Sequence, residues 1–252
     1  MKNLFKTTAA VAALAVGAIA AQADDVSEET RDLGAFDEVY LMGSMDVEIK
    51  VGGKQSVRIK ADSDIIEHIE TKIKGDALRI QMERGNYRNI RHMTVYITVP
   101  SLEAVGVHGS GDMTIDGAKA DDFDVEIHGS GNAIFNAPQF GKLDLSVHGS
   151  GDSSFENGKF GEVDISVHGS GDVEMSGSCD EVEVGVQGSG AVEVDDMVCK
   201  SADVTVQGSG DVSVHATESA KVAIQGSGDV EIHGNPDKLR TSVRGSGDIE
   251  IR

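Results

Sequence analysis

Histidine recurs at one place in this sequence, directly before the first four Gly-Ser-Gly triplets. Successive copies are 20 residues apart, and glutamine or arginine takes the same place before the later triplets: His108, His128, His148 and His168, then Gln187, Gln207, Gln225 and Arg244. If the repeats stack as parallel strands, the imidazoles form an outward column with neighbours about 4.8 Å apart. Neutral imidazole is a common ligand of transition metals, so these histidines are candidate metal ligands. The alternative is an exposed polar ladder, because a straight column points its nitrogens in parallel.

Carboxylates recur in two further columns. One follows the triplets, with an asparagine and an alanine as exceptions: Asp112, Asn132, Asp152, Asp172, Ala191, Asp211, Asp229 and Asp248. The other precedes the histidines: Asp124, Asp144, Asp164, Glu183 and Asp203. Stacked carboxylates repel one another unless water and salt screen them or weakly held cations bind them. Weak calcium binding is one hypothesis, and the other is that each corner Asp accepts backbone N–H hydrogen bonds. We expect no other cofactor.

The chain has two cysteines, Cys179 and Cys199, which are 20 residues apart. Each lies three residues before the first residue of an alternating strand, at Val182 and Ala202. They therefore occupy the same place in adjacent repeats. A parallel stack would separate their α-carbons by about 4.8 Å, within the range of roughly 4.4–6.8 Å that a disulfide accepts. The spacing predicts a disulfide between them.

The elements that position these side chains are set by the triplets themselves. Gly-Ser-Gly occurs eight times at intervals of 18 to 20 residues. A tight corner needs positive φ, which glycine adopts without steric cost, and glycine also lets neighbouring coils approach. The predicted structural corners are Gly109, Gly111, Gly129, Gly131, Gly149, Gly151, Gly169, Gly171, Gly188, Gly190, Gly208, Gly210, Gly226, Gly228, Gly245 and Gly247.

Alternating strands flank each corner. Residues 163–168 alternate apolar and polar side chains before one corner, and residues 172–175 alternate again after it. Each period of about 20 residues thus holds two strands of four to six residues, whose apolar side chains form two facing walls. An antiparallel meander and a parallel β-helix both fit this pattern. Parallel stacking places like residues over like, so the repetition favours an all-β, right-handed parallel β-helix.

The chain divides into four predicted parts. Residues 1–23 have a basic start, an apolar run and an Ala-Gln-Ala cleavage pattern, which predict a secretory signal peptide. Residues 24–35 are expected to be a flexible acidic N-terminus. Residues 36–102 repeat loosely and predict irregular N-terminal β coils, with a short helix from a cap at Asp62 or Ser63 through Ile69. Residues 103–252 form the repeat β-helix, continuous with the preceding part.

The net charge of −21 limits the partners. Nucleic acid and anionic lipid are excluded, because phosphate contacts need Lys and Arg. The apolar run of the leader is shorter than the roughly 20 residues of a spanning helix, so we expect no transmembrane segment in the mature chain.

The order of these features resembles a known family. A Phe36…Val39 opening precedes residues 57–62 (VRIKAD), residues 77–80 (ALRI), residues 95–102 (VYITVPSL) and the triplet array. This order is similar to the head GIN domain family of auto-transporter adhesins, and it covers nearly the whole mature chain. The resemblance implies an exported bacterial β-helix with Gly-Ser-Gly corners between two sheets, and an adhesive role.

Three functions remain open from the sequence. The first is a non-catalytic exported solenoid that binds or adheres at the bacterial cell envelope, located in the periplasm, on the outer surface or secreted. Its partner would be an envelope or surface protein or glycan, and a homo-oligomer is also compatible with the pattern. The second is a cation-binding structural protein of the periplasm. The third is a glycan-active enzyme, which is disfavoured because catalytic sites gather unlike groups whereas these polar positions repeat. We therefore predict no enzyme and no catalytic residue.

Overall fold

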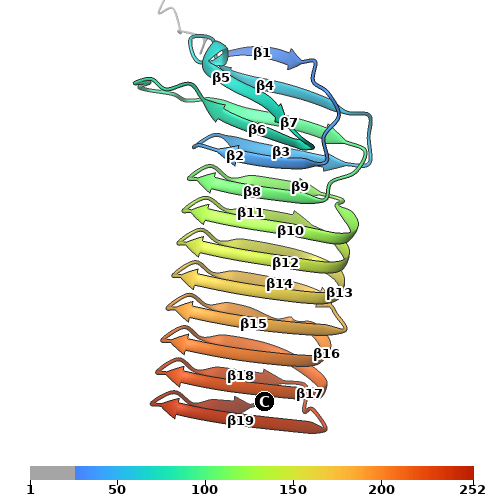
Figure 1. The fold of residues 1–252 in the computed structure, drawn as a ribbon, viewed down its shortest axis with the longest axis vertical. Helices are drawn as coiled ribbons and strands as arrows, with labels where there is room; N and C mark the ends of the chain where they lie inside the picture. The colour runs from blue at the N-terminus through green and yellow to red at the C-terminus, as the bar shows by residue number, and fades with distance from the viewer. Residues whose placement is uncertain (1–25) are drawn as a thin grey trace, which may run out of the picture.

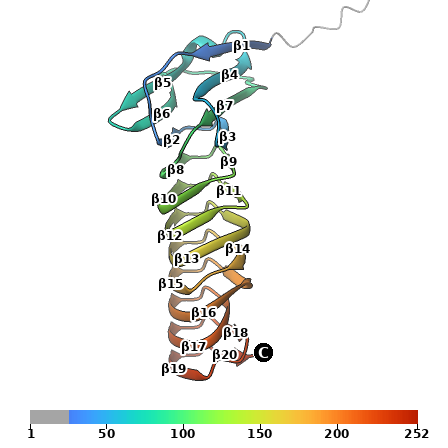
Figure 2. The same cartoon turned by 90° about the vertical axis from the view of Figure 1, so that its right-hand side faces the viewer.

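The computed structural model describes residues 26–252, so the predicted signal peptide lies outside the described residues. These residues form a column of stacked coils, a β-solenoid of about seven turns, with an N-terminal cap at one end (Figure 1). Turned by 90°, the same column is narrow and unbranched below the cap (Figure 2). The predicted β-solenoid of parallel coils is confirmed. Among residues 26–252, no helix is long and apolar enough to cross a membrane.

The cap and first coil contain β1 (Val26–Arg31), β2 (Glu38–Met42), β3 (Asp46–Val51), β4 (Ser56–Asp62), β5 (Ile69–Lys74), β6 (Ala77–Met82) and β7 (Met93–Val99). The repeats contain β8 (Ala104–Gly109), β9 (Met113–Asp116), β10 (Lys119–Gly129), β11 (Ala133–Asn136), β12 (Gln139–Gly149), β13 (Ser153–Gly169), β14 (Val173–Ser178), β15 (Glu181–Gly188), β16 (Val192–Gly208), β17 (Val212–Gly226), β18 (Val230–His233), β19 (Lys238–Gly245) and β20 (Ile249–Ile251).

Each repeat pairs in parallel with the next, in a register of one repeat period. On the face formed by β8, β10, β12 and the end of β13, histidine lies over histidine and glycine over glycine. We call this face A. The opposite face B contains β9, β11, β14, β18 and the first halves of β13, β16 and β17. The like-over-like register excludes the antiparallel meander for the repeat array.

The corners are held by glycine backbone. The first glycine of every triplet has positive φ, for example +131° at Gly149. The corners stack through hydrogen bonds, as where the N–H groups of Ser150 and Ser170 donate to the carbonyls of Gly129 and Gly149, both at 2.8 Å. A Cβ on Gly149 would collide with the Gly129 carbonyl. The predicted reasons for glycine, positive φ and close approach of coils, therefore both apply at the first corner position.

The core lies between the two faces. The predicted wall residues are buried along the column, and the phenylalanines of the second and third repeats stack there, with ring centroids 4.3 Å apart for Phe123 and Phe140. Alternation also assigns Val243 and Ile251 to these walls, but the last coil differs from this prediction. Val243 is 42% exposed and Ile251 is 50% exposed. They belong to β19 and β20, the last coil of the described residues, which pair with β17 and β18 (Figure 2).

A third paired segment joins the two faces and changes the predicted strand lengths. Residues 119–120, 139–140 and 159–160 pair with one another in register. In some coils the pairing runs without a break from face B through this segment into face A. A single strand then bends around the coil, and β13 and β16 are each 17 residues long for this reason. The expected four to six residues hold only for strands such as β9 and β11.

The N-terminal coils do not stack in chain order. The β2–β3 coil pairs in parallel with β6 and β7 on one side and with β8 and β9 on the other. The chain therefore completes this coil, builds the cap, and returns past it to begin the repeats. The corner of the β2–β3 coil is Gly43-Ser44-Met45, and the N–H of Ser110 donates to the Gly43 carbonyl at 3.0 Å.

Two expectations for the N-terminal third are wrong. The helix through Ile69 is only a 3₁₀ turn at Ile66–His68, preceded by Ile65 with no side-chain cap. The chain leaves it at once to form β5, which pairs antiparallel with β6. The expected flexible N-terminus instead contains β1, which pairs antiparallel with β4 in residue-by-residue register. This pairing supplies hydrogen-bond partners to an edge of the cap.

Candidate functional site

The predicted histidine column is present on face A. The ring centroids of His108, His128, His148 and His168 are separated by 4.8 Å at each step, and the rings are stacked. Parallel register produces this order, because each histidine directly precedes a stacked corner. At the N-terminal end of the column the ring of Tyr40 lies 6.0 Å from that of His108.

Two histidines of the column, His108 and His148, favour neutral imidazole. Burial lowers the pKa of His108, and the neighbouring His128 lowers it further, while Glu126 acts in the opposite direction. Burial also lowers the pKa of His148, with His128 and His168 as additional causes. Neutral imidazole is the form that binds metal ions, so these environments keep the ligand form available at neutral pH.

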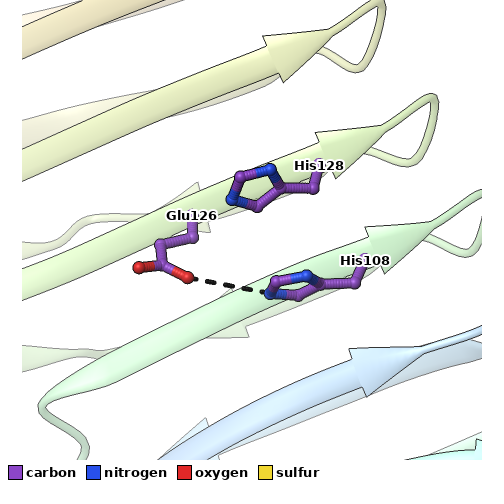
Figure 3. Close-up of side chains that lie close together, drawn as sticks. All are labelled: His108, Glu126 and His128. Carbon is purple, nitrogen blue, oxygen red and sulfur yellow. Dashed lines mark ion pairs between the residues drawn. The ribbon is translucent and has the colours of Figure 1, made fainter.

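One point of the column differs from the rest because a carboxylate joins it (Figure 3). Ligand atoms of His108, Glu126 and His128 all lie within 4.8 Å of one another. Glu126 Oε2 is 3.7 Å from His108 Nε2, and that nitrogen is buried without a hydrogen-bond partner. Sequence reasoning missed Glu126, although its position two residues before His128 in an alternating strand places both on one face.

The aspartates that directly follow the corners form a ladder of hydrogen bonds from one coil to the next. The side-chain Oδ1 of one residue accepts the backbone N–H of its equivalent in the next coil, as from Asp172 to Asp152 at 2.9 Å and from Ala191 to Asp172 at 2.7 Å. Asn132 fits the same ladder, since its Oδ1 accepts the N–H of Asp152 at 2.9 Å. These hydrogen bonds support the hypothesis that each corner Asp accepts a backbone N–H hydrogen bond.

Ala191 interrupts this ladder, and restoring it is expected to stabilise the protein. The change Ala191→Asn gives the backbone N–H of Asp211 a side-chain acceptor and adds no charge. We expect the free energy of unfolding to rise by about 1 kcal/mol, measured by urea denaturation. The matched variant Asn132→Ala removes the acceptor for Asp152 and also the Nδ2 donor to Asp112, and it is expected to lower the free energy of unfolding by at least a similar amount. Unchanged stability in both variants would show that the ladder contributes nothing.

The second carboxylate column lies on face A and is partly neutralised by lysine. Lys142 Nζ lies 3.0 Å from Asp144 and 3.1 Å from Asp164, and these hydrogen bonds raise the pKa of Lys142. Asp124 has a raised pKa, first because it is partly buried and then because Asp144 is near. A side-chain cation therefore performs part of the screening that we had expected from water, salt or bound cations.

Face B also carries carboxylates. Ser154, Glu174 and Glu193 are paired in successive coils, so their outward side chains form a row. One hollow of about 370 Å³ lies along this row, and a second of about 400 Å³ lies farther toward the C-terminus. The second is lined by Ala191, Glu193, Asp195, Asp211, Val212, Ser213, Asp229 and Glu231. Together these hollows form an open groove along face B, and its carboxylates suit a cationic ligand.

The predicted disulfide is formed. Cys179 and Cys199 have α-carbons 4.5 Å apart and are bonded through their sulfurs. Both are buried, in the third paired segment, where Phe140 and Phe160 occupy the preceding coils. The bridge links two successive coils.

The sequence matches one protein family, described as "Putative auto-transporter adhesin, head GIN domain", over residues 35–176 and 138–236. No curated protein matches it.

Several solved structures share the fold. One, described as a "putative lipid binding protein" from Parabacteroides distasonis, superposes with a TM-score of 0.84 at 24% identity, covering 90% of this chain and 97% of that one. A "putative adhesin" from the same species gives 0.82 at 19% identity, with coverage of 90% and 97%. Another "putative adhesin", from Parabacteroides merdae, gives 0.82 at 18% identity, with coverage of 90% and 96%.

Proposed function

This chain belongs to the head GIN domain family, and from that premise we propose that it is an exported, non-catalytic solenoid that binds a partner at the bacterial cell envelope. The observation that carries the proposal is the carboxylate groove of face B, which runs along several stacked coils. Carboxylates contributed by several coils can contact a repetitive or extended partner at several points at once, which raises avidity. We propose a cationic protein or glycan surface as that partner.

Two observations support export. The first 23 residues have the pattern of a secretory signal peptide, with a basic start and a small-residue cleavage pattern. The bridge between Cys179 and Cys199 suits an oxidising compartment, because thiols are kept reduced in the cytosol. Together they favour the periplasm or the outer surface over the cytosol.

Binding to envelope fractions tests the proposal. We expect labelled protein to bind bacterial envelope fractions saturably, and to bind less as salt rises, because ions screen exposed charges. The double variant Glu174→Lys, Glu193→Lys reverses charge in the groove and is expected to weaken binding about tenfold, which corresponds to about 1.4 kcal/mol.

The matched control is Glu183→Lys, which reverses one exposed charge on face A. We expect it to bind as the unchanged protein does. Absence of saturable binding would contradict the proposal, and equal weakening by the control would remove the groove as the contact surface. Cleavage of envelope polysaccharide by the purified protein would show that it is an enzyme instead.

A further inference from the structure

We propose that His108, Glu126 and His128 form a binding site for one divalent transition metal ion of the zinc class. Two imidazoles and one carboxylate are a ligand set that zinc uses, with its fourth position open to water or to a partner. This site lies on face A and is independent of the acidic groove on face B.

The three side chains come together because of strand geometry. Glu126 and His128 are two residues apart in β10, so both point outward from the same face, and His108 is paired directly with His128 across to β8. Figure 3 shows the carboxylate of Glu126 directed toward His108, with the ring of His128 above it. All three side chains are therefore attached to strands of the sheet rather than to a loop.

The distances are close to those of a bound ion. Zinc–nitrogen bonds of about 2.0–2.1 Å place two tetrahedral ligands about 3.4 Å apart. Glu126 Oε2 and His108 Nε2 are already 3.7 Å apart. Since all ligand atoms lie within 4.8 Å, the widest pair must close by about 1.4 Å. His128 and Glu126 are exposed on the surface, so rotation of their side chains can supply this movement.

An unsatisfied nitrogen provides a second, independent observation. His108 Nε2 is buried, has no hydrogen-bond partner and faces Glu126. Buried polar atoms are normally satisfied, so an orphaned one needs an explanation. A metal ion between this nitrogen and the carboxylate would satisfy both.

The same features are missing elsewhere along the column. At the equivalents of Glu126 in the next two coils the chain has Ser146 and Ser166, which supply no carboxylate. His215, Glu231 and His233 repeat the residue types on face B. There His233 Nε2 is likewise buried without a hydrogen-bond partner, 3.7 Å from Glu231. However, Glu231 already forms an ion pair with Arg252 at 2.9 Å, and His215 Nδ1 lies 3.2 Å from the carbonyl of Asp195. Within the column on face A, the carboxylate singles out the first histidine pair, and it differs from the face B cluster in having no arginine on its carboxylate among the ion pairs of residues 26–252.

The ligand types also indicate the ion. Imidazole nitrogen suits zinc, copper and nickel, whereas calcium takes oxygen ligands. Both cysteines are bonded to each other, so within residues 26–252 no free thiolate competes for the metal. We therefore expect zinc to bind here and calcium not to.

Calorimetric titration of the purified protein with zinc chloride tests the site. We expect one zinc ion per chain. The variant Glu126→Ser, which copies positions 146 and 166, is expected to weaken binding at least about 10-fold, and His108→Gln and His128→Gln about 100-fold. Glutamine occupies the same place at positions 187, 207 and 225, so these variants suit the fold.

The matched control is His168→Gln, at the far end of the column, which is expected to leave the affinity within about 2-fold. As a second readout, NMR of the imidazole nitrogens should show zinc shifting His108 and His128 but not His168. The proposal is overturned if the unchanged protein does not bind millimolar zinc, if Glu126→Ser leaves the affinity unchanged, or if His168→Gln weakens it as much as His128→Gln.

Discussion

The variant Gly149→Val is expected to lower the free energy of unfolding by about 4 kcal/mol. Two costs add at this residue. Its φ of +131° is a conformation that a β-branched residue rarely adopts. A Cβ would also collide with the carbonyl of Gly129, which is backbone in a hydrogen-bonded stack and cannot move without disturbing both neighbouring corners. Urea denaturation followed by circular dichroism measures the change.

Gly185→Val is the matched control for this result. Gly185 has no positive φ, and a Cβ there would meet only the carbonyl oxygen of Ile165, at 3.8 Å. Its side chain would point outward, where the paired residue of the next coil is Thr205. We expect stability equal to or slightly above that of the unchanged protein, because glycine weakens a strand interior. If Gly149→Val unfolds like the control, neither positive φ nor close approach of the coils makes glycine necessary at the corners.

The sequence predicts the repeat array well because, in a parallel stack, residues one repeat period apart in the sequence become direct neighbours in space. A spacing of 20 residues between Cys179 and Cys199, or between His128 and His148, becomes direct contact in the next coil. Alternation then assigns each side chain to the core or to the surface. Both inferences need only local pattern and one spacing, and neither depends on the rest of the chain.

The cap was less predictable because its pairings have no common period. β4 pairs antiparallel with both β1 and β7, and the β2–β3 coil lies between strands that follow it in the chain. No repeated motif marks these partners. Alternation likewise assigns Val243 and Ile251 to the core walls, although both are exposed in the last coil of the described residues. Glu126 was missed although it lies inside the repeat array. The following repeats have serine at its position, and a reading based on what the repeats share overlooks a residue that differs.

Removing the disulfide is expected to lower the free energy of unfolding by about 3 kcal/mol, the value for a cross-linked loop of roughly 20 residues. The double variant Cys179→Ala, Cys199→Ala tests this by urea denaturation. Both side chains are buried, so the variant also loses some packing, and this loss must be separated from the loss of the cross-link.

Reduction of the unchanged protein makes that separation. Reduced cysteines keep nearly all of their side-chain volume, so a reducing agent that does not alter the double variant should destabilise only the unchanged protein. If reduction accounts for most of the loss of about 3 kcal/mol, the effect comes from the cross-link, which restricts the unfolded chain. If reduction has no effect while the double variant is destabilised, packing alone explains the loss. Two free thiols in protein recovered from the periplasm would contradict the bridge and would remove the support that the bridge gives to export.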